Sequence, residues 1–162
     1  MNANDTILVY FSATNRTKNV ANIIAQKLGV KSVSLEPKEP YTLQDLDYNN
    51  PKARVYVELQ TRPNVALKNA LISDWQSYKN VIIGYPIWWY DYAWVMNEFL
   101  TSNDFNGKNI AVFATSASSG LGTSAENLAK KAKGAKIIAK KGFEMINERQ
   151  IWAWLDSIKG EM

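Results

Sequence analysis

The chain has 162 residues, of which 46% are apolar and 21% are charged, a composition typical of one globular domain spanning residues 1–162. It contains neither cysteine nor histidine, which excludes disulfides, thiolate nucleophiles, iron–sulfur clusters and histidine-dependent catalytic triads. We therefore predict no catalytic side chain and no metal site, and expect either a cofactor or plain binding. No apolar run approaches the ~20 residues of a membrane span, and no basic segment precedes the first apolar run. These absences predict a cytoplasmic protein.

The charge is unevenly distributed along the chain. Its 19 basic and 15 acidic residues give a formal net charge of +4, and lysines without any acid crowd residues 130–141. Such a patch attracts phosphate-bearing or acidic partners, but no signature of a nucleic-acid-binding module accompanies it. We favour a solvated helix face and strand end, and expect no nucleic acid and no membrane among the partners.

The first elements form a strand, a helix and a second strand. Apolar, β-forming residues run without interruption over residues 6–11, which is typical of a strand buried on both faces. Apolar residues then recur at helical spacing from Val20 to Leu28, and Gly29 predicts the end of that helix. A second strand is predicted over residues 31–35.

Residues 37–74 show the least regular pattern. Pro51 suits the first turn of a helix, and the pair Arg62 and Pro63 suits a turn. Neither a strand nor a long helix is indicated, so the structure of this segment is left open.

Three more strands follow, over residues 80–85, 108–114 and 135–143. The helix between the first two is predicted to bury Val95, Met96, Phe99 and Leu100. Thr123 and Glu126 have the spacing of a capping box, before a helix that Gly134 ends. Its predicted buried positions are Ala125, Leu128, Ala129 and Ala132. Asn147 and Gln150 predict the start of a last helix. Its predicted buried positions are Ile151, Trp154, Leu155 and Ile158.

This alternation predicts an α/β fold: a three-layer, doubly wound, five-stranded parallel sheet with helices on both faces. Five strands fit the order 2-1-3-4-5 better than a six-stranded dinucleotide-binding sheet does. Ligands of such sheets bind beyond the carboxyl ends of the strands, where the strand order reverses. The loops after the first, third and fourth strands are therefore the candidate site.

The loop after the first strand carries hydroxyl groups at residues 12, 14 and 17 and leads into a helix. Backbone N–H groups and the helix dipole favour a phosphate there. The loop is neither GxGxxG nor GxxxxGK[ST], which argues against a dinucleotide fingerprint and an NTPase loop. Because Ser, Thr and Asn also cap helices, an ordinary N-cap is the alternative.

The loop after the third strand is aromatic. Six of the 19 aromatic residues of the chain fall between Tyr85 and Trp94. Tryptophans in a loop need partners for their N–H groups and leave apolar surface near water. The alternatives are a platform for a flat ligand, a protein interface, or core packing alone.

The loop after the fourth strand, residues 115–122, contains small hydroxyl residues and glycines that allow close backbone approach and offer hydrogen bonds. Together the three loops describe a site for a flat, phosphorylated, polyol-bearing ligand. FMN fits that description.

Three motifs at these loops resemble the flavodoxin-like family, in particular its short bacterial FMN-binding members. They are YFSATNRT (10–17), GYPIWW (84–89) and TSASSGLG (115–122), and the resemblance extends over nearly the whole chain. It implies three sets of contacts with FMN. The implied phosphate ligands are Ser12, Thr14, Asn15, Arg16 and Thr17. The implied contacts of the flavin ring are Pro86, Ile87, Trp88 and Trp89. The implied contacts of the ring edge are Thr115, Ser116, Ala117, Ser118, Ser119 and Gly120.

The chain departs from the family pattern at two places. Asn15 stands where the family has glycine, and because asparagine tolerates the left-handed conformation we expect the turn to be kept. Residues 90–93, YDYA, replace a segment that commonly carries glycine and a later proline, so the outer face of the ring has no assigned contact. Electron-carrying flavodoxins are typically acidic, whereas this chain is basic, which favours a flavin reductase over a carrier.

These observations predict an FMN-binding oxidoreductase or electron-transfer protein in which the flavin supplies the chemistry. An NAD(P)H-dependent quinone or flavin reductase and a one-electron carrier are both open. Their partners would be NAD(P)H and a quinone-type small molecule, or a redox partner protein. A homodimer through the aromatic loop is a further alternative, as is a flavin-free binding or signalling domain of the same fold.

Overall fold

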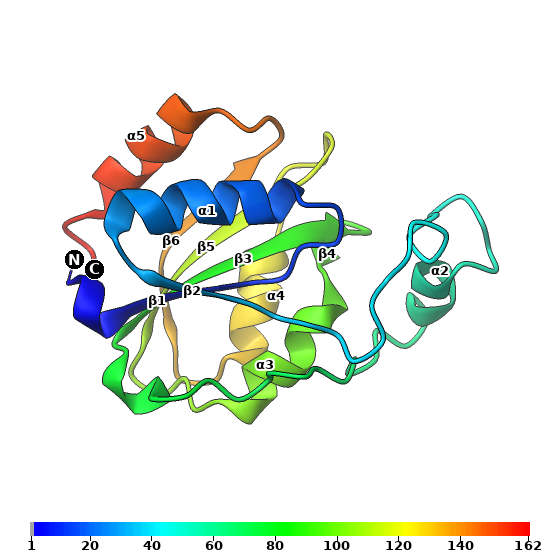
Figure 1. Cartoon of the computed structure of the whole chain (residues 1–162), viewed down its shortest axis with the longest axis horizontal. Helices are drawn as coiled ribbons and strands as arrows, with labels where there is room; N and C mark the ends of the chain where they lie inside the picture. Colours follow the sequence, from blue (N-terminus) through cyan, green and yellow to red (C-terminus); the bar gives the residue numbers. More distant parts are fainter. Residues whose placement is uncertain (1) are drawn as a thin grey trace.

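A computed structural model describes residues 2–162, and a parallel sheet lies at its centre (Figure 1). Five strands run parallel in the order β2-β1-β3-β5-β6. Their bounds are β1 Thr6–Tyr10, β2 Lys31–Ser34, β3 Asn80–Trp88, β5 Asn109–Thr115 and β6 Lys136–Phe143. If β5 and β6 are numbered as the fourth and fifth predicted strands, this order is 2-1-3-4-5. The predicted α/β fold and its topology are confirmed.

Helices cover both faces of the sheet. The helices α1 (Arg16–Leu28) and α5 (Glu148–Ile158) pack on one face, and α3 (Asn97–Ser102) and α4 (Ser124–Lys131) pack on the other (Figure 1). The remaining helical segments are short: α2 (Arg54–Glu58) and the 3₁₀ turns η1 (Ala3–Asp5), η2 (Trp75–Ser77) and η3 (Trp94–Met96). Within residues 2–162, no helix combines the length and the apolar character needed to cross a bilayer.

Alternate residues of the central strands fill two cores. In β3, Val81 and Ile83 belong to the core under α3 and α4, whereas Ile82 belongs to the core under α1 and α5. All three are fully buried, as are Ile7 and Leu8 of β1. The continuous apolar runs of the sequence therefore mark strands covered on both faces, as predicted.

The aromatic segment is a hairpin rather than a free loop. β3 continues to Trp88, three residues beyond its predicted end, and pairs antiparallel with the two-residue strand β4 (Asp91–Tyr92). Trp89 and Tyr90 form the turn with φ values of 45° and 63°. A two-residue hairpin turn with positive φ at both positions favours Asn and Gly, so two aromatic residues hold a strained backbone here.

The predicted helix ends are partly confirmed. Gly29 ends α1 in the left-handed conformation, with φ of 65°. The Asn147 side chain accepts a hydrogen bond from the backbone N–H of Gln150 at 3.2 Å. The capping box at Thr123 is wrong, because its side chain makes no capping hydrogen bond and Glu126 is paired with Lys140 instead.

The three remaining signals have different outcomes. Helix α4 ends at Lys131, and Gly134, with φ of 83°, lies in the turn beyond it. Helix α2 begins three residues after Pro51, so Pro51 belongs to the preceding turn and its expected place in a first helical turn is wrong. Arg62 has φ of 44° and its N–H donates to the carbonyl of Glu58 at 2.7 Å, so the chain turns over residues 59–61, just before the predicted position at Arg62 and Pro63.

Strand β6 forms one edge of the sheet and is irregular. Its partners in β5 shift register between Ile110 and Ala111, which pair with Ile137 and Ala139, so Ile138 is an extra residue in β6. The strand also exposes Lys136, Lys140 and Lys141.

Candidate functional site

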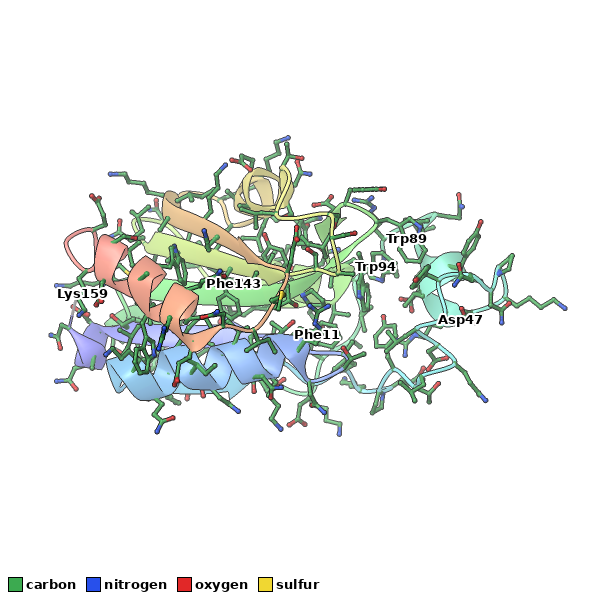
Figure 2. All side chains as sticks on the ribbon, turned by 90° about the horizontal axis from the view of Figure 1, so that it is seen from above. Phe11, Asp47, Trp89, Trp94, Phe143 and Lys159 are labelled. Atoms are coloured by element: carbon green, nitrogen blue, oxygen red, sulfur yellow. The ribbon has the colours of Figure 1, made fainter. Side chains whose placement is uncertain are left out.

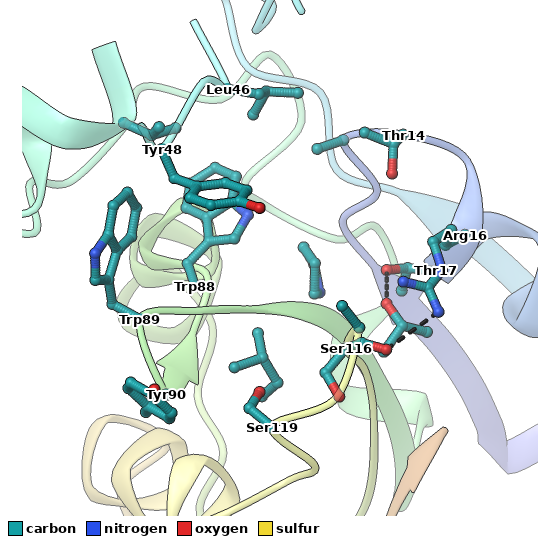
Figure 3. A pocket seen from close by; sticks show the side chains of 16 residues that line it. Thr14, Arg16, Thr17, Leu46, Tyr48, Trp88, Trp89, Tyr90, Ser116 and Ser119 are labelled. Carbon is teal, nitrogen blue, oxygen red and sulfur yellow. Dashed lines mark hydrogen bonds between the residues drawn. The ribbon is translucent and has the colours of Figure 1, made fainter. Parts of the chain in front are cut away.

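A cavity of about 440 Å³ opens at the carboxyl edge of the sheet, within the size range of small-molecule sites (Figure 3). It brings together the three predicted loops and part of the segment 37–74. The residues that line it are Ala13, Thr14, Arg16, Thr17, Leu46, Tyr48, Val55, Pro86, Ile87, Trp88, Trp89, Tyr90, Thr115, Ser116, Ala117 and Ser119.

The loop after β1 presents hydrogen-bond donors at one end of the cavity. Asn15 adopts φ of 67°, the left-handed conformation expected for it, and α1 begins at the next residue. The first turn of a helix leaves its N–H groups without intrahelical partners. Ser12 Oγ accepts from the N–H of Lys18 at 3.1 Å, whereas the N–H groups of Arg16 and Thr17 make no hydrogen bond within residues 2–162.

Two side chains connect this loop to the loop after β5. The buried hydroxyls of Thr17 and Thr115 lie 2.8 Å apart and share a hydrogen bond. The Arg16 guanidinium donates to the carbonyl of Ser116 at 3.1 Å and also to the carbonyl of Glu144. Arg16 therefore holds two neighbouring loops against the start of α1 while its side chain lines the cavity.

The loop after β5 is itself supported from below. Ser116 Oγ accepts from the N–H of Gly120 at 3.0 Å. Gly142 of β6 lies so close under the loop that a Cβ there would be 3.0 Å from the backbone nitrogen of Leu121. This close packing fixes the polar side of the cavity.

The aromatic hairpin forms the apolar side of the cavity. Trp88 and Trp89 are partly exposed and line it. Behind them, Trp94 lies 4.8 Å from Trp88 and stacks 6.1 Å from Trp89, measured between ring centroids. Tyr85, Tyr92 and Trp94 are buried, so half of the aromatic cluster is core and the other half faces the cavity or solvent.

A carboxylate joins the hairpin region to the segment 37–74. Glu58 accepts hydrogen bonds from the Tyr41 hydroxyl at 2.6 Å, the Trp94 indole N–H at 2.8 Å and Arg54 Nε at 2.7 Å. Burial, followed by the hydrogen bond to Glu58 and its charge, raises the pKa of Tyr41 far above its ordinary value. The phenol therefore remains a donor, and these contacts anchor the segment.

The cavity contains little charge. Arg16 is the single charged residue among those that line it. The nearby carboxylate of Asp91 is neutralised by Arg62 at 2.5 Å, with the Asp91 side chain mostly buried. A bound ligand would therefore meet one cation and no facing acid.

Most of the sequence-predicted site residues lie around this one cavity. Those outside the lining set are Ser12, Asn15, Ser118 and Gly120. Sequence reasoning missed Leu46, Tyr48 and Val55, because the segment that carries them has no periodic pattern. It also missed Tyr90, which follows the two predicted tryptophans, and Ala13, which lies between the predicted Ser12 and Thr14. Most of the predicted FMN-binding residues thus line one cavity, and their contact with FMN stays a prediction.

The chain belongs to the flavodoxin family. Residues 5–158 match that family. A candidate flavoprotein from Bacteroides eggerthii is 34% identical, with a TM-score of 0.86 over 95% of this chain and 97% of that one. A second, from Bacteroides uniformis, is 29% identical, with a TM-score of 0.88 over 96% and 99%.

A more distant relative was solved with a ligand. The Lactobacillus acidophilus flavoprotein in complex with FMN is 20% identical, with a TM-score of 0.68 over 94% of this chain and 99% of that one. At this identity the likeness concerns the fold. No curated protein matches the sequence.

Proposed function

We propose that this protein binds FMN and acts as a two-electron oxidoreductase on small molecules of the NAD(P)H, quinone or flavin type. The observation that carries the proposal is the single cavity in which a helix N-terminus with hydroxyls, an aromatic hairpin and a small polar loop meet. Membership of the flavodoxin family and the FMN complex of the Lactobacillus acidophilus relative support it.

The residues present fit FMN. Thr14 and the N–H groups at the start of α1 would hold the phosphate, Trp88 and Trp89 would contact the flavin ring, and Ser116 and Ser119 would bond its polar edge. FMN, when bound, supplies the electron-accepting chemistry that a chain without cysteine or histidine lacks. The chain's own part is binding, orientation and exclusion of water.

The charge around the cavity supports two-electron chemistry. A negative charge beside a flavin opposes its full reduction, because the reduced ring is readily anionic. Here no acid lines the cavity and Asp91 is paired with Arg62. Charges farther than about 10 Å are screened at physiological salt, so the local Arg16 matters more than the net charge.

A stepwise reductive titration of the FMN-loaded protein, followed by absorbance, tests this function. We expect both electrons to enter in one step, because nothing in the cavity penalises the second. Two well-separated reduction steps would contradict the proposal and favour a one-electron carrier. Failure of the chain to bind FMN at all would reject both.

Substitutions at the start of α1 should separate two roles. We expect Thr14→Ala to weaken FMN by about 10- to 100-fold, the scale of one hydrogen bond to a charged group, and to leave riboflavin unaffected. Arg16→Ala should weaken both ligands, because Arg16 also positions the loop of Ser116 through its carbonyl. Titration calorimetry measures all four affinities.

The nearby helix residue Asn19 provides the matched control. It is exposed in the next turn of α1 and does not line the cavity, so Asn19→Ala should bind both ligands as the parent does. Equal weakening of FMN and riboflavin by Thr14→Ala would show that this loop is structural and binds no phosphate.

A further inference from the structure

A second cavity lies at the carboxyl end of β6, next to α5. Its volume is about 660 Å³, within the size range of small-molecule sites. It is lined by the end of β6 and the loop after it, by α5, and by Gly120 of the loop after β5. None of its lining residues also lines the first cavity. We call this second cavity the α5 groove, and the proposed function assigns it no role.

One stripe of α5 forms the inner side of the groove. Gln150, Ala153, Trp154 and Ser157 line it, and their spacing places them on one face of the helix. Phe143, the last residue of β6, lies between the sheet and α5 (Figure 2), with its ring 5.9 Å from that of Trp154. Trp154 is therefore held by the core, whereas the small Ala153 side chain leaves space beside it.

Trp154 has a hydrogen-bond donor that the chain does not use. The residue is only 7% exposed, yet its indole N–H makes no hydrogen bond within residues 2–162. A buried tryptophan usually finds a partner for this group. In the same part of the chain, the fully enclosed side-chain polar atom without a partner is Oε2 of Glu126. The Trp154 nitrogen is thus not sealed in, and an acceptor can reach it from the groove.

The groove contains one cation and one acid. Lys141 and Glu144 are the charged residues that line it, both are exposed, and neither forms an ion pair within residues 2–162. The preceding lysine, Lys140, is paired with Glu126 instead. A carboxylate on a ligand would therefore find the Lys141 ammonium and the Trp154 N–H, and a hydroxyl group would find an acceptor in Glu144.

The remaining surface of the groove suits an aromatic ring. Met145 lines it and is 77% exposed. A methionine thioether makes favourable contacts with aromatic rings, and Ala153 adds a further apolar contact on the α5 side. The groove thus combines an apolar contact surface with separate positions for a carboxylate and a hydroxyl group.

The loop after β5 separates the groove from the first cavity. Ser116 and Ser119 line the cavity, whereas Gly120 lines the groove. The N–H of Gly120 donates to Ser116 Oγ at 3.0 Å. Arg16, which lines the cavity, donates to the backbone carbonyls of both Ser116 and Glu144. Groups of the groove are thus bonded directly to groups of the cavity.

We propose that the α5 groove binds a small aromatic carboxylate that carries a hydroxyl group, and that this binding strengthens cofactor binding in the neighbouring cavity. Lys141 and Trp154 hold the carboxylate, Met145 contacts the ring and Glu144 accepts from the hydroxyl group. A ligand that orders Glu144 and Gly120 also orders the loop of Ser116, so a cofactor bound afterwards loses less entropy. Only this coupling rests on the proposed FMN function.

Binding of 4-hydroxybenzoate, observed through the indole N–H signals of the ¹⁵N-labelled protein, tests the groove. Of the six tryptophans, Trp154 is identified by the signal that Trp154→Phe lacks. We expect the probe to shift this signal. Lys141→Gln should weaken the probe about tenfold, the scale of one hydrogen bond to a charged group. Lys136→Gln is the matched control, since Lys136 is exposed in the same strand and does not line the groove.

A neutral analogue separates the charge from the ring. The parent protein should bind 4-hydroxybenzamide about tenfold more weakly than 4-hydroxybenzoate, and Lys141→Gln should leave the affinity for the amide unchanged. Both comparisons use exposed positions or an altered probe, so they do not depend on whether Trp154→Phe folds.

Titration calorimetry tests the coupling. Saturating 4-hydroxybenzoate should tighten FMN about fivefold, and FMN should tighten the probe by the same factor, because coupling between two sites is reciprocal. In Arg16→Ala this factor should fall toward one, since Arg16 connects Ser116 with Glu144.

The outcomes separate this inference from the proposed function. An unmoved Trp154 signal, or a probe affinity that Lys141→Gln leaves unchanged, would overturn the groove as a site. An FMN affinity that the probe does not alter would overturn the coupling. Binding of the probe at Trp154 by a protein that binds no FMN would support the groove and reject the proposed function alone.

Discussion

Replacement of Gly84 by alanine should destabilise the protein by at least about 3 kcal/mol, the upper part of the range for overpacked cores. Gly84 lies in β3 directly opposite Phe113 of β5, and the fully buried Phe113 ring lies across it. A Cβ at Gly84 would be 2.1 Å from Cζ of Phe113 and 2.5 Å from its Cε1. Neither strand can move, because both are central in the sheet. Thermal or urea unfolding measures the loss.

Two further variants make this prediction specific. Gly160 has no heavy atom within 4 Å of its ideal Cβ, so Gly160→Ala should change stability by less than about 0.5 kcal/mol. Phe113→Leu removes the ring atoms that clash, so adding it to Gly84→Ala should cost less than the sum of the two single changes. If Gly84→Ala were as stable as the parent, the close approach of Phe113 would be wrong.

Replacement of Glu58 by glutamine should cost about 3 kcal/mol and loosen the segment 37–74. The carboxylate accepts from three donors, those of Tyr41, Trp94 and Arg54, and only 16% of its side chain is exposed. Hydrogen bonds to a charged group contribute about 1.5 to 3 kcal/mol each. The NH₂ group of a glutamine side chain is itself a donor, so it would face one of the three donors with no acceptor between them. The pKa of Tyr41 should fall toward its ordinary value, because Glu58 contributes to raising it.

Glu36→Gln, at the residue immediately before this segment, is the matched control. Glu36 faces Lys68 at 4.0 Å with both side chains more than half exposed, and such surface pairs contribute little. Unfolding in urea, together with a spectrophotometric titration of tyrosine, compares the two variants. A Glu58→Gln protein with the stability of Glu36→Gln would show that the segment is held by other contacts.

The central sheet could be predicted because its signals are local. Residues 7–11 and 81–85 carry no polar side chain, and a short run of this kind, rich in β-forming residues, is typical of a strand covered on both faces. The carboxyl ends of these strands then determine where the loops meet. The predicted loops therefore lie around one cavity although 98 residues separate Thr17 from Thr115.

The features that were missed depend on distant partners. Glu126 has the spacing of a capping box with Thr123, but Lys140 of β6 binds its carboxylate instead. The turn at Trp89 and Tyr90 lacks the Asn or Gly that marks such a hairpin, and packing against Trp94 and Tyr56 holds Trp89 in it. Tyr48 lies near the cavity because long-range contacts, those of Glu58 among them, anchor its segment, and no local pattern indicates them.

The irregular strand β6 bears on how the protein behaves at high concentration. An unpaired outer strand offers its backbone groups to the sheet of another molecule, the first step of many aggregates. In β6, the extra residue Ile138 interrupts the regular spacing of those groups. If a second copy approached with its own β6, Lys136 and Lys141 of the two molecules would repel each other. We therefore expect β6 not to pair with a strand of a second molecule. Concentrated solutions of the protein should resist fibre formation at this edge of the sheet.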